Sequence, residues 1–310
     1  MKKEQNSPKR KKTLMQIMNT PKVAGYVFIL PFIVGFIAFM ALPMLLSFGF
    51  SFTRYNILEA PVFIGLENYK TMFTSDPKFW KVFGVTMYYV LFSVPLRLLM
   101  ALIVAMLLVK STKLSGFYRA VYYLPSIIGS SVAVAILWKR MFASDGVINA
   151  LLQTIGINSE IAWLGRTDTA IWTLIILAVW QFGSSMLIFL SALKQIPGSL
   201  YESAKVDGAN GFVTFWKITI PMLTPTIFFN LILQIINGFR VFTESYVITD
   251  GGPLDSTLSY VLYLYRRAFT YFDMGYSCAL AWVLVAIVSV FTVILFKTQK
   301  SWVYYEAGRE

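Results

Sequence analysis

The sequence has no histidine and a single cysteine, Cys278, among its 310 residues. The lack of histidine excludes a histidine-ligated metal site and a histidine general acid–base pair. One cysteine cannot form a disulfide within the chain. Cys278 lies in a long apolar run, where its simplest interpretation is a small packing residue. We therefore expect no catalytic residue, no metal and no cofactor, and we disfavour an intramembrane hydrolase.

The sequence also has no glycine–lysine pair, so the phosphate-binding motif Gly-x-x-x-x-Gly-Lys-Ser/Thr is absent. The chain therefore cannot hydrolyse ATP through a P-loop. Acidic residues are scarce, with 15 against 27 lysines and arginines, and only Glu244 falls within an apolar run. Ion-coupled secondary transporters often carry carboxylates in several spans. This scarcity argues against that class of transporter.

Apolar length is what the sequence has in abundance. The chain is 57% hydrophobic and 16% aromatic, with a mean hydropathy of +0.65. A helix crosses the hydrocarbon core with ~20 residues, and six runs reach or approach that length. They cover residues 23–50, 82–109, 120–138, 169–190, 222–246 and 274–296. Because backbone groups in lipid need internal partners, we predict an all-α membrane protein with six transmembrane helices.

Lysine and arginine are divided unevenly between the segments that flank these runs. Sixteen lie in the alternate segments that include both chain ends, and nine lie in the other three. Because positive residues concentrate on the cytoplasmic side, we expect both termini and the loop at 192–221 to be cytosolic. The net charge of +12 is then mainly a topology signal and not a nucleic-acid footprint.

We expect three parts along the chain. Residues 1–22 form a basic cytosolic segment with a short interfacial helix at 14–18, residues 23–297 form the membrane domain, and residues 298–310 form a cytosolic tail. The first apolar run is too long for a signal peptide and is predicted to be an uncleaved span. Pro31 and Pro43 should kink it.

Several polar residues interrupt the apolar runs, and each is costly in lipid unless it faces protein or water. Arg97 lies in the second run and Gln181 in the fourth. In the fifth run the spacing places four polar residues on one helical face, namely Asn230, Gln234, Asn237 and Glu244. Arg240 lies four residues before Glu244, so the two could form a structural pair. These seven residues could line an aqueous path or could join helices to one another.

The segment at 192–221 is more elaborate than a connection between two spans requires. Residues 200–206 can form a short helix, and residues 207–211 indicate a turn because glycine and asparagine accept positive φ. A second amphipathic helix is expected from Val213, and Pro221 marks the start of the next run. The pattern alone is also compatible with an interfacial helix that rests on lipid headgroups.

The residues of this loop closely resemble the EAA loop of permease subunits of bacterial ABC importers. That consensus begins Glu-Ala-Ala, has a glycine four residues after the second alanine, and ends at Ile-x-Leu-Pro. The matching positions are Glu202, Ser203, Ala204, Asp207, Gly208, Ala209, Phe215, Ile218 and Pro221. Ser203 in place of the first alanine and Ile220 in place of the leucine are mild departures. The resemblance implies that the loop docks into a groove of a separate ATPase subunit.

Stretches at 65–80, 124–152 and 249–276 also resemble carbohydrate-uptake permeases, so the resemblance covers nearly all of 24–297. It implies a core like that of type I ABC importers, which pairs with a second homologous permease. It further implies two ATPase subunits that bind ATP, an external solute-binding protein, and alternating access. An ion-coupled transporter, a channel and a membrane scaffold are the rival classes, and none of them explains the loop at 192–221.

The identity of the sugar is not readable from the sequence. Arg97 and Arg240 would suit an acidic sugar such as a uronate, and they would also suit neutral sugars or structural pairing. An oligosaccharide derived from a plant polysaccharide is our hypothesis for the substrate.

Overall fold

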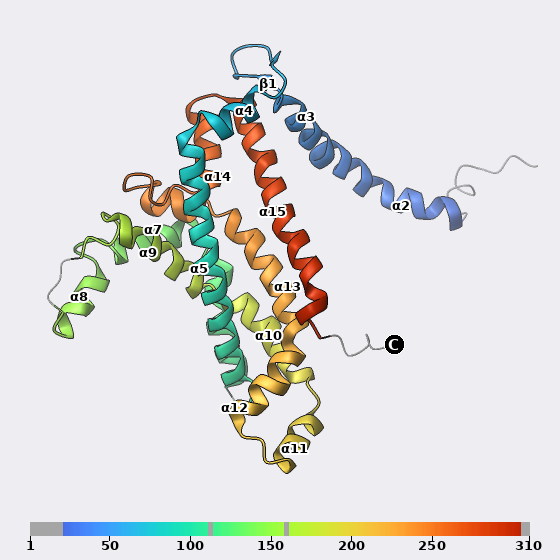
Figure 1. Ribbon diagram of the computed structural model, residues 1–310, viewed down its shortest axis with the longest axis vertical. Helices are drawn as coiled ribbons and strands as arrows, with labels where there is room; N and C mark the ends of the chain where they lie inside the picture. Colours follow the sequence, from blue (N-terminus) through green and yellow to red (C-terminus); the bar gives the residue numbers. More distant parts are fainter. Residues whose placement is uncertain (1–20, 111–113, 158–160, 305–310) are drawn as a thin grey trace, which may run out of the picture.

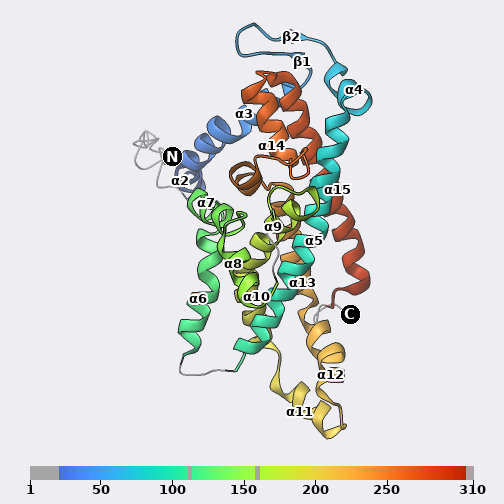
Figure 2. The same ribbon diagram turned by 90° about the vertical axis from the view of Figure 1, so that its left-hand side faces the viewer.

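The computed structural model describes residues 21–110, 114–157 and 161–304. The interfacial helix expected at 14–18 lies outside these described residues. The described chain is mainly helical, and its one sheet is a two-residue antiparallel hairpin of β1 (Thr53–Arg54) and β2 (Val62–Phe63). The hairpin lies at one end of the molecule, at the top of Figure 2, and helices α11 and α12 lie at the opposite end.

Four helical stretches of the described chain are long and apolar enough to cross a membrane, and two bent helix pairs raise the number to six. This agrees with the six predicted spans. The helices are, in order, α2 (Pro21–Phe36), α3 (Leu42–Phe50), α4 (Glu67–Thr74), α5 (Pro77–Leu108), α6 (Ser115–Ile128), α7 (Val132–Met141), α8 (Val147–Thr154), α9 (Thr167–Trp180), α10 (Gly183–Gln195), α11 (Gly198–Val206), α12 (Gly211–Thr214), α13 (Ile220–Phe239), α14 (Tyr260–Tyr265) and α15 (Met274–Trp302). Four π-helical turns join or extend them, namely η1 (Ile37–Ala41), η2 (Phe215–Thr219), η3 (Ser245–Thr249) and η4 (Arg266–Thr270).

Two of the π turns precede a proline. Turn η1 lies between α2 and α3, two residues before Pro43, and η2 lies between α12 and α13, two residues before Pro221. Proline has no amide hydrogen and its ring crowds the carbonyl four residues back, so a wider turn at that point lets the helix continue. Near Pro43 the first span therefore widens and does not end, and Pro31 lies inside α2.

Spans three, four and five are not the straight helices that we predicted. Helices α6 and α7 meet at an angle of 99°, and α9 and α10 meet at 41°. The fifth span starts earlier than expected, at Gly211, and runs without a break to Phe239. It then ends, so the predicted helix over 222–246 is wrong beyond Phe239. Residues 240–242 are not helical, and η3 follows them.

Helix α5 lies at the centre of the bundle and packs against α9, α10 and α13. The larger core cluster joins these four helices, and a smaller one lies near the hairpin end around Phe79 and Tyr260. The first span touches the bundle mainly through α3, where Trp282 of α15 packs on Phe48 and donates to Ser47 Oγ at 3.3 Å. Helix α2 then runs away from the bundle (Figure 1) with exposed apolar side chains.

Candidate translocation cavity and docking loop

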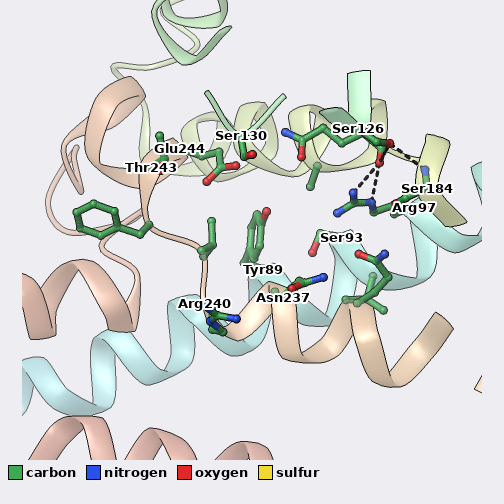
Figure 3. Close-up of a pocket in the computed structure, with 17 residues that line it drawn as sticks. Tyr89, Ser93, Arg97, Ser126, Ser130, Ser184, Asn237, Arg240, Thr243 and Glu244 are labelled. Atoms are coloured by element: carbon green, nitrogen blue, oxygen red, sulfur yellow. Dashed lines mark hydrogen bonds between the residues drawn. The ribbon is translucent and has the colours of Figure 1, made fainter. Parts of the chain in front are cut away.

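A polar cavity of about 490 Å³ opens where the broken spans meet α5 (Figure 3). Its walls come from α5, from the break between α6 and α7, from the break between α9 and α10, and from the end of α13. The polar side chains that line it are Tyr89, Ser93, Arg97, Ser126, Ser130, Gln181, Ser184, Gln234, Asn237, Arg240, Thr243 and Glu244. The volume falls in the ~300–1,000 Å³ range of small-molecule sites.

The break in span four exposes a backbone carbonyl to side chains of two other helices. The carbonyl oxygen of Gln181 accepts from Arg97 Nε at 3.0 Å and Nη2 at 2.6 Å, and from Ser126 Oγ at 2.9 Å. Ser126 Oγ in turn accepts from the backbone N–H of Ser184 at 2.9 Å. A buried carbonyl without a partner would be costly. We call Arg97, Ser126, Gln181 and Ser184 the span-four junction.

Close approach of two backbones makes this junction possible. A Cβ at Gly183 would lie 2.3 Å from the carbonyl oxygen of Tyr122, and a Cβ at Gly129 would lie 2.5 Å from the Gln181 side chain. Only glycine fits at such distances, as in other close helix contacts within membranes. Glycine at both positions therefore lets the break in span three and the break in span four meet.

The charged groups of the cavity are close enough to interact but form no ion pair within 4.0 Å among the described residues. Glu244, Arg97 and Tyr89 all line the cavity. The side chain of Gln181 is buried, and its Nε2 has no hydrogen-bond partner in the part of the chain that the structure describes. One donor at the cavity wall, Gln181 Nε2, thus has no acceptor within hydrogen-bond distance among the described residues.

The structure corrects the predicted pair of Arg240 and Glu244. That pair assumed a helix continuing through residue 244, but α13 ends at Phe239 and Arg240 becomes its C-cap residue. In the view of Figure 3, Glu244 and Arg240 lie on opposite sides of Tyr89. No ion pair joins them among the described residues, and Arg240 is exposed to the cavity.

The polar face predicted for span five is only partly on the cavity. Gln234 and Asn237 line it, and Gln234 Nε2 donates to Ser185 Oγ at 3.0 Å. Asn230 is fully buried outside the lining, where its Nδ2 donates to the carbonyl of Thr226 at 3.0 Å. Asn230 lies one turn before Gln234 on α13 and outside the cavity lining. Residues on one face of a helix therefore need not line the same cavity.

Sequence reasoning missed the serines and the tyrosine of the cavity. Ser126 lies near the end of α6 and Ser130 lies in the break of span three. On α5, Tyr89 lies two turns before Arg97 and Ser93 lies one turn before it. The signal for Ser130 was present, because residues 129–131 read Gly-Ser-Ser within an apolar run. Tyr89 and Ser93 could have been found as the residues on the Arg97 face of α5 at helical spacing.

The loop at 192–221, which we call the docking loop after the role that the sequence resemblance implies, has the local structure that its residues predict. Helix α11 ends at Val206, and Gly208, which follows the cap residue Asp207, has φ +73. The Gly208 N–H donates to the Lys205 carbonyl at 3.2 Å, and the Ala209 N–H donates to the Ala204 carbonyl at 2.9 Å. These two bonds form a Schellman C-cap, which favours glycine at this position. Asn210 then caps the next helix, because its Oδ1 accepts from the Val213 N–H at 2.9 Å.

The second helix of the loop differs from the prediction in its extent. It begins at Gly211 and continues through η2 into the fifth span, so it is no separate interfacial helix. Phe215 and Pro221 are half-buried along it. The hydroxyls of Tyr201 and Thr219 lie 3.1 Å apart and tie α11 to this helix. The loop is thereby held as an extension of spans four and five.

The surface of the loop combines charge with exposed apolar side chains. Glu202, Ser203, Asp207 and Gly208 are exposed, Ala209 is half-buried, and Ala204 is buried on the inner side of α11. Val206 is 88% exposed, Phe212 73% and Trp216 54%. Such apolar exposure at one tip, together with polar neighbours, is typical of a protein-binding surface.

A second polar cluster lies at the opposite end of the molecule, and we call it the outer network. Asp76 caps α5 and accepts from Tyr263 Oη, from Tyr276 Oη at 2.5 Å and from Arg267 Nη2 at 3.4 Å. Arg267 also lies 3.8 Å from Asp273. Burial alone would raise the pKa of Asp76, but these tyrosines and the Arg267 charge together hold that pKa below its ordinary value.

Comparison with known proteins identifies the family. Residues 71–300 match the family described as binding-protein-dependent transport system inner membrane component. The chain is 56% identical to the probable ABC transporter permease protein YesP of Bacillus subtilis (strain 168), over 93% of this chain and 94% of that protein. It is 32% identical to the arabinooligosaccharides transport system permease protein AraP of the same organism, over 90% of each chain.

Its fold is similar to that of a chain in the crystal structure of a bacterial alginate ABC transporter in complex with alginate pentasaccharide-bound periplasmic protein. The TM-score is 0.78 at 22% identity, and the match covers 93% of this chain and 97% of that one. The fold is thus that of a type I importer permease. The chain belongs to the binding-protein-dependent inner membrane components and is a non-catalytic, multi-pass permease subunit of a bacterial sugar ABC importer, in which a separate subunit hydrolyses ATP.

Proposed function

We propose that this chain forms one half of the translocation path of an ATP-driven, binding-protein-dependent importer of oligosaccharides. The observation that carries the proposal is the polar cavity where two broken spans meet α5 and the end of α13. Broken helices at membrane depth are tolerated where they line a cavity or are buried in protein, and substrate sites of transporters are built in this way. The side chains of Arg97, Gln181, Gln234, Asn237, Arg240 and Glu244 would contact or frame the sugar.

The other half of the path would come from a second homologous permease. Two ATPase subunits would bind at the docking loops of the pair, and a solute-binding protein would deliver sugar at the hairpin end. When ATP brings the ATPase subunits together, the two docking loops would approach each other and the spans would open outward. The exposed residues Glu202, Asp207, Phe212 and Trp216 support the docking role, because they combine charge with an apolar anchor at one tip.

The substrate that we propose is an oligosaccharide released from a plant polysaccharide. One relative is named for arabinooligosaccharides, and another, 30% identical and from Thermoanaerobacterium thermosulfurigenes, is named a probable starch degradation products transport system permease protein. Arg240 has no ion-pair partner among the described residues and would suit a uronate carboxylate or a pair of hydroxyls. This proposal is tested by the uptake of a labelled panel of neutral and uronate-bearing oligosaccharides by the parent strain, a deletion strain and the complemented deletion strain. A parent that takes up none of them would contradict it.

The docking role is tested by Gly208→Asp. Gly208 lies in the left-handed region and a Cβ there would meet no atom within 4 Å, so the added carboxylate would project from the proposed dock. We expect normal amounts of protein in the membrane and at least ~10-fold less co-purified ATPase, because an unpaired charge in an interface costs several kcal/mol.

Gly208→Asn is the matched control. Asparagine has the same shape as aspartate and also tolerates positive φ, so it should retain more of the ATPase than the aspartate variant does. Normal transport and normal ATPase pull-down in Gly208→Asp would rule out the proposed dock.

A further inference from the structure

Helix α10 connects the cavity to the docking loop as a single rod. It starts directly after the break at Gln181 and ends at Gln195, and only Ile196 and Pro197 separate it from α11. At ~1.5 Å per residue its 13 residues span about 20 Å. Figures 1 and 2 show α10 running from the middle of the bundle toward the end where α11 lies. The link between α11 and α10 is therefore only two residues long.

The upper end of α10 is fastened by side chains where helical hydrogen bonds are interrupted. At the span-four junction the Gln181 carbonyl is held by the fork of Arg97 from α5 and by Ser126 from α6. Ser126 also holds the Ser184 N–H in the first turn of α10. Gln181 has φ −82 and ψ 30, outside the helical region. Three separate elements thus meet at one carbonyl beside the cavity.

Such a break is where a helix pair changes its angle most easily. Residues at helix ends absorb the change in φ and ψ during hinge motion, while the packed rods on either side stay intact. Helix α5 packs against α9, α10 and α13, so it contacts both helices of the bent pair. Arg97 anchors the break to α5. A swing of α10 about this anchor would move the side chains of Gln181 and Ser184 within the cavity.

We infer that Arg97 is a positioning residue that holds the hinge of span four and couples the docking loop to the cavity, and that it is not a ligand of the sugar. This inference deepens the proposed function and rests on it for the identity of the two coupled sites. Its basis is that Nε and Nη2 of Arg97 are both committed to the Gln181 main chain. Arg240, in contrast, has no partner of this kind among the described residues and remains the candidate sugar contact.

Arg97→Lys is the variant that tests the inference, because lysine keeps the charge but cannot donate from two fixed positions to one carbonyl. In the complete transporter reconstituted in liposomes, we expect the maximal rate of uptake to fall ~10-fold, the typical effect of losing a charge-assisted hydrogen bond. ATP hydrolysis stimulated by loaded binding protein should fall in parallel. The KM for uptake should stay within about 2-fold of wild type, since the sugar contacts are unchanged.

Two further variants accompany it. Arg166→Lys is the matched control, because Arg166 makes the same Nε and Nη2 fork to Asp168 at the exposed start of α9, the end of that helix away from α10. It should transport like wild type. Ser126→Ala removes the second holder of the carbonyl without changing charge, so it should lower the maximal rate in the same way, by ~3-fold. It also keeps the test decisive if Arg97→Lys does not accumulate.

A direct measurement of the hinge does not need the sugar. Spin labels at Ile176 of α9 and Lys194 of α10, both exposed, report the angle between the two rods in a Cys278→Ser background. The distance between them should change when ATP is added to the complete transporter, and Arg97→Lys should broaden or abolish that change. An unchanged distance in the wild-type complex would overturn the inference.

The kinetic outcomes separate the alternatives. A KM raised ~10-fold with an unchanged maximal rate in Arg97→Lys would make Arg97 a sugar ligand and overturn the inference. Wild-type kinetics in both Arg97→Lys and Ser126→Ala would also overturn it. If the wild-type transporter imports none of the oligosaccharides while the labels still move with ATP, the inference stands and the proposed substrate class fails.

Discussion

The outer network and the cavity are built from the same kinds of side chain, but they differ in how completely those side chains are paired. Around Asp76 two tyrosine hydroxyls, an arginine and two backbone amides converge on one carboxylate. Around Gln181 an arginine, a carboxylate and a tyrosine line one cavity, and no ion pair within 4.0 Å joins them among the described residues. Fully satisfied polar networks rigidify a structure, whereas polar groups that line a cavity are available to hydrogen-bond a ligand.

The largest effect is expected from breaking the outer network. Asp76 is 7% exposed and joins residues almost 200 positions apart. Asp76→Ala leaves the Arg267 charge and two tyrosine hydroxyls without their acceptor, and removal of one partner of a buried charged cluster costs about 3–5 kcal/mol. The melting temperature of the detergent-solubilised protein should fall by many degrees, or the variant should fail to accumulate.

The exposed pair of Arg166 and Asp168 supplies the control. Each side chain is about 60% exposed, and surface pairs contribute little to stability. Asp168→Ala should melt like the wild type. If Asp76→Ala and Asp168→Ala melted alike, the contrast between a structural network and a functional cavity would lose its first half.

A second, smaller effect is expected in the cavity and should be functional. Arg240→Gln removes a side chain that has no ion-pair partner among the described residues. The free energy of unfolding should therefore change by no more than ~0.5 kcal/mol, and the melting temperature should change little. Uptake should fall by ~10-fold, with ATP hydrolysis in response to loaded binding protein largely retained. Labelled-sugar uptake and a thermal melt on the same preparation measure both quantities.

Two comparisons sharpen this prediction. The double variant Arg240→Gln, Glu244→Gln should not restore expression or uptake, because the two side chains do not form a pair. Arg267→Gln in the outer network makes the same chemical change and should lower stability instead. Wild-type uptake by both Arg240→Gln and Asn237→Leu would remove this face of α13 from the sugar path.

The docking loop and the start of α5 show what the sequence could predict. The docking loop is fixed by local chemistry: Gly208 accepts a positive φ, Asn210 caps the helix that follows, and both effects act within a few residues. The number of spans followed from apolar length alone. Asp76 followed by Pro77 likewise has the residues of a helix start, and α5 begins at Pro77, five residues before the predicted start of the second span.

The cavity was only partly predictable because it depends on where helices break. The face drawn from Asn230 to Glu244 assumed one continuous helix, and the end of α13 at Phe239 separates Glu244 from Arg240. The break in span four is held by Arg97, a residue 84 positions away. Helical spacing carries no information on such a contact, and the polar and glycine residues at 181–184 were the only local sign of it.

The smallest effect is expected from mild acid, and its sign differs between two carboxylates of the outer network. Hydrogen bonds and the Arg267 charge hold the pKa of Asp76 below 3.8, so its contribution to stability is fully present above that pH. It is lost only as the pH falls through the lowered folded-state value. Burial raises the pKa of Asp273, so protonation of that carboxylate relieves a cost while the pH is still above 3.8.

The melting temperature should therefore change little from pH 7 downward, rise slightly as pH 4 is approached, and fall below it. Asp273→Asn should remove the rise and Asp76→Asn the acid fall. A melting temperature that already drops between pH 7 and pH 5 in the wild type, but not in Asp76→Asn, would mean that the Asp76 carboxylate is not held ionised by its tyrosine and arginine partners.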